Sequence, residues 1–187
     1  AAVTAGIYLG WHTPELTTSQ VRLQGVAGWE IVNKIKPDIV VTDLDGNSKF
    51  LQKAEKSGAI MVVHAHGDNT DILKKLVPKF RKLVGSTQVA PVENVHNFGG
   101  FTDGDRSVFL AEEFGAQQII LFGMEFGPKV GKYSKDTVKE MGLKRRKMQA
   151  GKKLLAMLAK NSRSQLFDTS PRPIKGFEFF RLEGKRS

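Results

Sequence analysis

Residues 38–47 read DIVVTDLDGN, a short β-branched run followed directly by two aspartates. A continuous apolar run of this length is typical of a strand that is buried on both faces of a parallel sheet. Because alternate side chains of an extended chain point to the same side, Asp43 and Asp45 are predicted to lie together, with Gly46 freeing the turn. Paired carboxylates at a strand end favour Mg²⁺ held together with phosphates. The alternative is a polar turn in which Asp45 caps the next helix.

Outward from this stretch, apolar strands and periodic helices alternate. Residues 59–64 (AIMVVH) and 119–122 (IILF) predict further buried strands, and residues 48–57 and 105–114 predict helices. The other predicted elements are strands at residues 2–9, 87–95 and 176–181 and helices at residues 29–34, 70–83 and 135–160, with a kink at Pro78. This alternation indicates an α/β fold with a three-layer, mostly parallel sheet. Ligands of such sheets gather beyond the carboxyl ends of the strands.

A second polar cluster, HAHGDN at residues 64–69, also follows a predicted buried strand. His64 and His66 are two residues apart and share a face, and Asp68 extends the row. By itself this run resembles the HxHxD ligands of zinc hydrolases. The alternative is a buried, hydrogen-bonded His64, with Asp68 or Asn69 capping the next helix.

A third cluster, GGFTDGDR at residues 99–106, precedes a predicted helix. Glycines beside a helix N-terminus can present backbone N–H groups to phosphate oxygens, and Thr102 belongs to the same predicted nucleotide-binding loop. Asp103 and Asp105 are candidates to complete a metal shell, and Arg106 offers a planar fork for phosphate. The alternative is a turn with Asp105 as the helix N-cap.

Charge is distributed unevenly along the chain. The net charge is +10, with 12 basic and 14 acidic residues in residues 1–128 against 17 basic and 5 acidic residues in residues 129–187. We therefore expect an α/β catalytic core over residues 1–128, and a basic helix and strand over residues 129–187 packed on the same domain. This asymmetry favours a polyanionic partner, which is a nucleic acid, a membrane surface or a phosphorylated small molecule. Lys132, Lys144 and Lys147 are candidates to balance a triphosphate, although a solvated helix face explains most such residues.

Composition excludes several classes of protein. The 187 residues contain no cysteine, so disulfides, thiolate zinc sites and cysteine nucleophiles are excluded. The first residues, AAVTAGIYLG, lack a signal-peptide pattern, and no apolar run approaches the ~20 residues that cross a bilayer. We expect a cytoplasmic protein without a membrane partner.

Three motifs in order, PDIVVTDLDGN, VHAHGDN and GFTDGDRS, resemble the archaeal 6-hydroxymethyl-7,8-dihydropterin diphosphokinase family, a distant relative of thiamine pyrophosphokinase. The resemblance covers roughly residues 28–134 and implies a fold like the thiamine pyrophosphokinase catalytic domain. It implies Mg²⁺-dependent transfer of diphosphate from ATP to the pterin hydroxymethyl group, releasing AMP, in tetrahydromethanopterin or folate-type biosynthesis. Before the first motif the chain reads GVAGWEIV, without the Ala-Asp-Gly-Ala-like motif of the family.

The resemblance also implies roles for individual residues. Asp43 and Asp45 would be metal ligands, joined by Asp103 or Asp105, and Arg106 would complete the site. The second motif would line the same site through His64, His66, Asp68 and Asn69. If a base is needed, His64, His66 or Asp68 is the candidate.

Other functions stay open at this point. One alternative is a pyrophosphokinase that acts on another hydroxyalkyl heterocycle, such as thiamine. Another is a zinc-dependent hydrolase that uses His64, His66 and Asp68. A haloacid-dehalogenase-type phosphatase would carry its DxDG aspartate on the first strand, whereas Asp43 follows a later one. Three acidic strand-end loops disfavour a nucleic-acid partner. The expected partners are therefore ATP and a pterin alcohol, and homo-oligomer formation is left open.

Overall fold

A computed structural model describes residues 6–13, 16–25, 37–46, 48–124 and 138–181, and these form one nine-stranded sheet with helices. The strand order is β6-β5-β4-β3-β2-β1-β7-β8-β9. The strands are β1 (Gly6–Thr13), β2 (Leu16–Gly25), β3 (Ile39–Thr42), β4 (Ile60–Ala65), β5 (Leu83–Thr87), β6 (Val95–His96), β7 (Gln118–Phe122), β8 (Gln165–Asp168) and β9 (Glu178–Phe179). Only β1 runs antiparallel to its neighbours in this described sheet, so the predicted mostly parallel α/β fold is confirmed.

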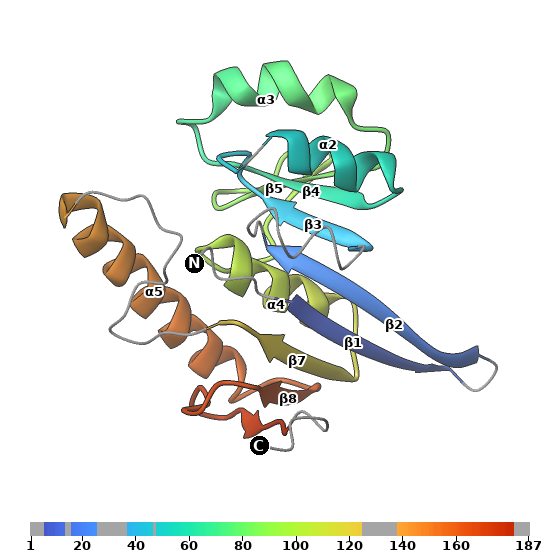
Figure 1. Ribbon diagram of the computed structural model, residues 1–187, viewed down its shortest axis with the longest axis vertical. Coiled ribbons are helices and arrows are strands. Elements are labelled where there is room, and N and C mark those ends of the chain that lie inside the picture. Colours follow the sequence, from blue (N-terminus) through green and yellow to red (C-terminus); the bar gives the residue numbers. More distant parts are fainter. Residues whose placement is uncertain (1–5, 14–15, 26–36, 47, 125–137, 182–187) are drawn as a thin grey trace.

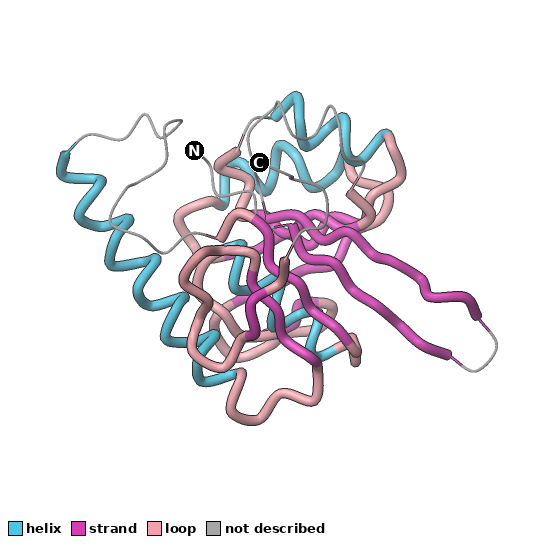
Figure 2. Tube along the Cα trace, turned by 60° about the horizontal axis from the view of Figure 1, so that its bottom comes forward, coloured by secondary structure: helices cyan, strands magenta, loops and turns pink. Residues whose placement is uncertain are grey.

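Helices cover both faces of the sheet (Figures 1 and 2). They are α2 (Ser48–Lys56), α3 (Thr70–Leu76) with the 3₁₀ turn η1 (Val77–Lys79), α4 (Asp103–Glu113) and α5 (Val138–Leu158). None of the helices in the described ranges combines the length and apolar character that a membrane span requires.

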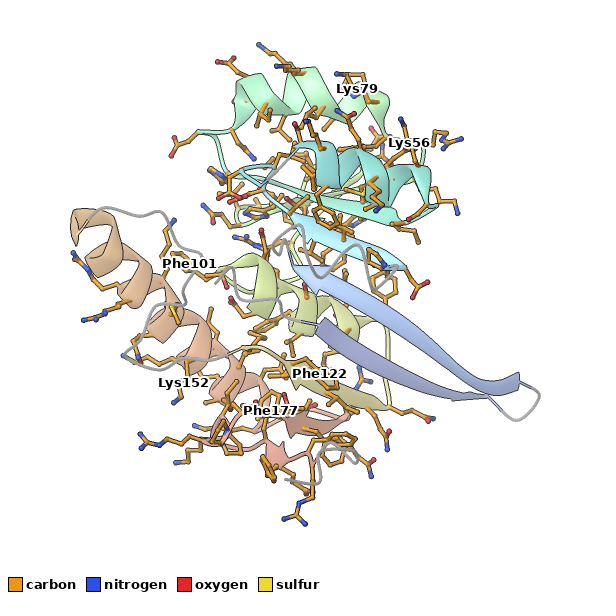
Figure 3. The ribbon with its side chains drawn as sticks, in the orientation of Figure 1. Lys56, Lys79, Phe101, Phe122, Lys152 and Phe177 are labelled. Atoms are coloured by element: carbon orange, nitrogen blue, oxygen red, sulfur yellow. The ribbon has the colours of Figure 1, made fainter. Side chains whose placement is uncertain are left out.

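Successive side chains of the central strands β3 and β4 point to opposite faces of the sheet and so belong to two separate hydrophobic cores. Val40 and Met61 belong to the core formed with α2 and α3, whereas Val41 and Val62 belong to the core formed with α4 and α5. Successive side chains of a strand point to opposite faces, so a strand covered on both sides must be apolar throughout. The outer helix surfaces are polar, and side chains such as Lys56 and Lys79 lie at the edge of the molecule (Figure 3).

Most of the central predictions are confirmed. The strands predicted at residues 38–42, 59–64 and 119–122 correspond to β3, β4 and β7, and the helices at residues 48–57 and 105–114 correspond to α2 and α4. The helix predicted at residues 29–34 lies outside the described residues.

Two predictions in the middle of the chain are wrong. Pro78 does not kink a long helix, because α3 already ends at Leu76 and Pro78 lies in the 3₁₀ turn η1. A proline lacks the N–H that would continue the helix. The strand predicted at residues 87–95 is also wrong, since β5 ends at Thr87 and β6 begins only at Val95. This shift places Ser86 inside β5 and Gln88 directly after it.

The N- and C-terminal parts of the sheet were predicted incompletely. The strand expected at residues 2–9 overlaps β1, but its hairpin partner β2 was missed, as was β8. Figure 1 shows this β1–β2 hairpin projecting beyond the other strands.

Candidate active site

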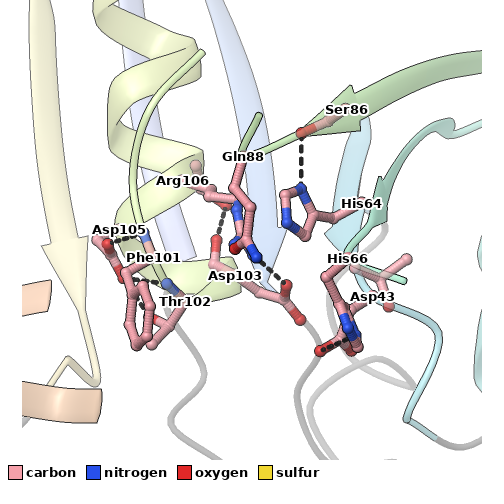
Figure 4. A network of polar contacts seen from close by, with 12 residues as sticks. Asp43, His64, His66, Ser86, Gln88, Phe101, Thr102, Asp103, Asp105 and Arg106 are labelled. Carbon is pink, nitrogen blue, oxygen red and sulfur yellow. Dashed lines mark hydrogen bonds and ion pairs between the residues drawn. The ribbon is translucent and has the colours of Figure 1, made fainter. Parts of the chain in front are cut away.

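Three carboxylates converge where two segments of the chain meet. Asp43 and Asp45 follow β3, Asp103 is the first residue of α4, and one oxygen of each lies within 4.8 Å of the other two. Figure 4 shows Asp43 and Asp103 approaching each other from these two elements. The predicted pairing of the first and third motifs is therefore present in the fold.

The turn that carries Asp43 and Asp45 differs from the extended backbone that the sequence suggested. Leu44 adopts a left-handed conformation with φ 71°, and the N–H of Asp45 donates to Asp43 Oδ1 at 3.2 Å. The N–H of Leu44 donates to Thr42 Oγ1 at 2.9 Å. A non-glycine residue in this region is strained by about 1–2 kcal/mol. Burial of the Leu44 side chain in the core beneath α2 holds the turn in place.

The cluster is electrostatically unfavourable as it stands. Desolvation and the neighbouring charges of Asp43 and Asp45 raise the pKa of Asp103 well above its ordinary value. Desolvation, a hydrogen bond with Asp43 and the charge of Asp43 raise the pKa of Asp45 to about 6. In addition, Oδ1 of Asp103 is buried and accepts no hydrogen bond from any residue in the described ranges. A hard cation bound by oxygen ligands would relieve the repulsion and satisfy this oxygen, so the residues present fit Mg²⁺.

Asp105 is not brought into this cluster. Its carboxylate accepts hydrogen bonds from the N–H groups of Phe101 (2.6 Å) and Thr102 (2.8 Å) and from the Thr102 hydroxyl. Thr102 is the N-cap of α4 and Asp105 its third residue, so the pair forms a capping box. Asp105 was expected as a metal ligand or as the N-cap, and the structure gives it neither position. The Thr102 side chain, expected at the nucleotide, is engaged in the same box.

The two histidines lie beside the acidic cluster without joining it. His64 is buried, its Nδ1 lies 3.1 Å from Ser86 Oγ, and within the described part of the chain its Nε2 has no hydrogen-bond partner. Burial, and then the positive charge of Arg106, lower the pKa of His64 to about 4. His66 Nε2 lies 3.8 Å from Asp43 Oδ2.

The ligand set of a zinc hydrolase is not assembled from the second motif. Asp68 is exposed, and within the described ranges the one group with metal-ligand spacing contains Asp43, Asp45 and Asp103 and neither histidine.

Asn69 joins the ends of β3 and β4. Its Nδ2 donates to the backbone carbonyls of Asp43 at 2.9 Å and His64 at 2.7 Å, and its Oδ1 accepts from the N–H of His66 at 3.2 Å. Although Asn69 occupies the N-cap position of α3, its side chain makes no cap hydrogen bond. The residue therefore fixes the two acid- and histidine-bearing loops relative to each other.

The basic residues differ in how closely they approach the acids. Arg106 is buried in the first turn of α4, with Nη1 3.7 Å from Asp103 Oδ1 and Nη2 donating to Gln88 Oε1 at 3.5 Å. Lys147, exposed on α5, lowers the pKa of Asp45 by its charge. The structure places Lys144 on α5 without describing its side chain, and Lys132 lies outside the described residues.

Ser86 and Gln88 were missed as site residues. The strand was predicted at residues 87–95, so its carboxyl end was expected near residue 95. The carboxyl end of β5 is in fact at Thr87, which places Ser86 and Gln88 at the edge of the sheet where the site lies. The signal was available, since the polar run Ser86-Thr87-Gln88 marks the end of this strand.

The fold and the site together define a class of protein. This is an α/β protein with a candidate site for a hard divalent cation, formed by three carboxylates at the carboxyl-terminal edge of its parallel strands. The chain belongs to the MptE-like family of 6-hydroxymethylpterin diphosphokinases, whose match covers residues 31–131. This range contains all three carboxylates of the cluster, the two histidines and Arg106.

Three archaeal relatives carry the name 6-hydroxymethyl-7,8-dihydropterin pyrophosphokinase. The chain is 46% identical over 132 residues to the protein of Methanothermobacter thermautotrophicus, covering 68% of this chain and 57% of the relative. It is 46% identical over 140 residues to that of Pyrococcus furiosus, covering 73% and 60%. It is 51% identical over 111 residues to that of Methanocaldococcus jannaschii, covering 57% and 46%. The chain thus matches roughly half to three fifths of the length of these relatives.

Proposed function

We propose that this protein transfers diphosphate from ATP to the hydroxymethyl group of 6-hydroxymethyl-7,8-dihydropterin and releases AMP. The observation that carries the proposal is the cluster of Asp43, Asp45 and Asp103 inside the region shared with proteins of that name. We extend the proposal to a fold like the thiamine pyrophosphokinase catalytic domain, a core at residues 1–128 with residues 129–187 packed on it, a cytoplasmic location and a role in pterin cofactor synthesis.

Asp43, Asp45 and Asp103 would hold Mg²⁺. The raised pKa values of Asp45 and Asp103 support this assignment, as does Asp103 Oδ1, which accepts no hydrogen bond from the described residues, because a cation offsets like-charge repulsion. When bound, Mg²⁺ supplies charge neutralisation and orientation of the ATP phosphates.

The chain itself contributes mainly position and charge. In the proposed reaction the acceptor hydroxyl oxygen bonds to the β-phosphorus of ATP and releases its proton to water, while the bond from that phosphorus to the oxygen bridging to the α-phosphate breaks, so that AMP leaves. Arg106, buried beside Asp103, and Lys147, near Asp45, supply positive charge at the two sides of the acidic cluster. Fixed charges of this kind act on transferring phosphates without covalent participation of the protein.

The test is AMP release from ATP and Mg²⁺ with a panel of hydroxymethyl heterocycles that includes thiamine. We expect turnover with the dihydropterin, loss of at least about 100-fold in the Asp43→Asn variant, and normal turnover in Glu93→Gln, an exposed carboxylate change. Absence of AMP release with every acceptor would remove the proposed function. Near-normal turnover of Asp43→Asn would leave the activity in place and remove the metal assignment.

A further inference from the structure

The imidazole of His64 has one satisfied nitrogen and one unsatisfied nitrogen in a buried position. The side chain is 1% exposed, Nδ1 lies 3.1 Å from Ser86 Oγ, and Nε2 has no hydrogen-bond partner among the residues that the structure describes. Buried polar atoms are nearly always hydrogen-bonded, because an unpaired one loses its hydration without compensation. An unpaired nitrogen at the carboxyl end of β4, where ligands of such sheets bind, indicates a ligand contact.

Ser86 holds the ring in a fixed orientation. Ser86 and His64 lie opposite each other on the paired strands β5 and β4, and Figure 4 shows the ring with one nitrogen on Ser86 and its other edge toward Gln88 and Arg106. Gln88 lies close enough to the ring to act against the lowering of the pKa of His64, but among the described residues no donor or acceptor meets Nε2 with hydrogen-bond geometry. Because a hydroxyl can donate or accept, Ser86 fixes the ring while leaving Nε2 able to accept or donate.

Charge divides the site into two parts. The part around Asp43, Asp45 and Asp103, with Lys147 beside Asp45, holds the groups that suit a metal-bound polyphosphate. Arg106 lies between the two parts, with Nη1 3.7 Å from Asp103 Oδ1 and Nη2 donating to Gln88 Oε1 at 3.5 Å. The part at the ends of β4 and β5 offers His64, Ser86 and Gln88, none of which carries a permanent charge. An uncharged heterocycle carries N–H and carbonyl groups on its ring edge, and a small number of neutral polar side chains can fix its orientation by hydrogen bonds to these groups.

We propose that His64 Nε2 hydrogen-bonds the acceptor heterocycle, and that Ser86 is the positioning residue that presents it. The inference rests on the proposed function, and it assigns the acceptor to the ends of β4 and β5 and the nucleotide phosphates to the acidic side. His66 directly follows β4, and its Nε2 lies 3.8 Å from Asp43 Oδ2. Asp43 therefore lies where the two parts of the site meet.

Two substitutions at one position separate the two nitrogens. In His64→Asn the amide can replace Nδ1 toward Ser86 but does not reach the place of Nε2, whereas in His64→Gln the longer side chain reaches that place. Ser86→Ala removes the support and keeps the imidazole. Thermal unfolding of each variant reports whether the fold is retained.

The readouts are KM for the dihydropterin, KM for ATP, and direct binding of three probes without turnover. The probes are the dihydropterin, followed by its fluorescence, α,β-methylene-ATP with Mg²⁺, and inorganic triphosphate with Mg²⁺. We expect His64→Asn to raise KM and Kd for the dihydropterin about 10-fold or more, with KM for ATP changed less than about 2-fold. His64→Gln should recover much of this loss, and Ser86→Ala should raise KM for the dihydropterin about 3–10-fold.

Three results would overturn the inference. Unchanged dihydropterin binding in His64→Asn would assign the buried ring to structure alone. If His64→Asn bound α,β-methylene-ATP more weakly but inorganic triphosphate as tightly as the unmodified protein, adenine and not the acceptor would lie against His64. If His64→Asn does not fold, equal dihydropterin KM values for Ser86→Ala and the unmodified protein would contradict the role of the pair. If the unmodified protein released no AMP in response to any acceptor, the proposed function would be rejected instead, and the dihydropterin titration would still test whether His64 contacts the heterocycle.

Discussion

Replacing Asp45 with asparagine is expected to stabilise the protein in the absence of divalent cations while weakening its response to them. Asp45 lies with Asp43 and Asp103 in a cluster whose carboxylate oxygens fall within 4.8 Å of one another. Asparagine keeps the shape of the side chain and removes its charge. The repulsion that Mg²⁺ would relieve is then reduced by mutation, and a ligand is weakened at the same time.

The magnitude follows from the pKa of Asp45, which is raised from 3.8 to about 6. About two pKa units correspond to about 3 kcal/mol as an upper bound, and because the side chain is exposed, solvent screening reduces this to about 1 kcal/mol. A pKa raised in the folded state means that the folded protein holds this proton more tightly than the unfolded chain. Its stabilising contribution is therefore present below about pH 4 and lost as the pH rises through about 6.

The assay is thermal unfolding with EDTA or Mg²⁺, with Glu93→Gln as the matched control for loss of an exposed carboxylate. With EDTA at about pH 7.5, Asp45→Asn should raise Tm by about 3 °C, and at about pH 4 the gain should largely disappear. The increase in Tm caused by Mg²⁺ should shrink in Asp45→Asn and persist in Glu93→Gln. A Tm in EDTA no higher than that of the control would refute the repulsion argument, and a full Mg²⁺ response would refute the role of Asp45 as a ligand.

Three further predictions concern the groups that hold the site. Asn69→Ala should lower the free energy of unfolding by about 2–3 kcal/mol in chemical denaturation, since three hydrogen bonds joining β3 and β4 are lost; a change under about 0.5 kcal/mol would contradict this. Gly151→Ala should lower the free energy of unfolding by about 1–3 kcal/mol, because a Cβ there would lie 2.9 Å from Asp105 Oδ1. Gly142→Ala on the same helix should raise it by up to about 1 kcal/mol, because a Cβ there would meet no described atom within 4 Å. Equal effects of the two changes would argue against close packing of α5 on α4. Asp105→Asn should lower Tm through loss of the capping box while leaving the Mg²⁺ concentration at half-maximal activity unchanged, and a large shift of that midpoint would restore Asp105 as a ligand.

The parts of the fold that could be predicted are those where burial alone determines the sequence. β3 and β4 contact helices on both faces, so their residues are apolar as far as Thr42 and His64, and these polar residues and those after them indicate the strand ends. β2 was missed because residues 16–25 (LTTSQVRLQG) contain no such run, and its pairing with β1 depends on a hairpin that propensity does not reveal. β8 is only four residues long, and its pairing with β7 is a long-range contact.

Within the site, a two-residue error in a helix boundary decided one assignment. The predicted helix began at residue 105, which left Asp103 and Asp105 in a loop where both could reach a cation. α4 begins at Asp103, so both lie in its first turn. Residues two apart on a helix point about 200° apart around its axis, so only one of them can face the cluster. Asp103 does so, and Asp105 turns back to the cap.

The site combines a destabilising centre with a separate support. Asp43, Asp45 and Asp103 repel one another, and Leu44 holds a left-handed backbone between two of them. The support consists of hydrogen bonds that do not involve the cluster oxygens, those of Asn69 between loops and those of the capping box at α4. Because the two sets of interactions are distinct, a change in the support alters stability first and metal affinity only through displacement of the loops. A change among the three carboxylates has the reverse effect, since removing like charge favours folding while removing a ligand abolishes binding. The opposite signs of these two responses distinguish a cation site from an ordinary polar turn.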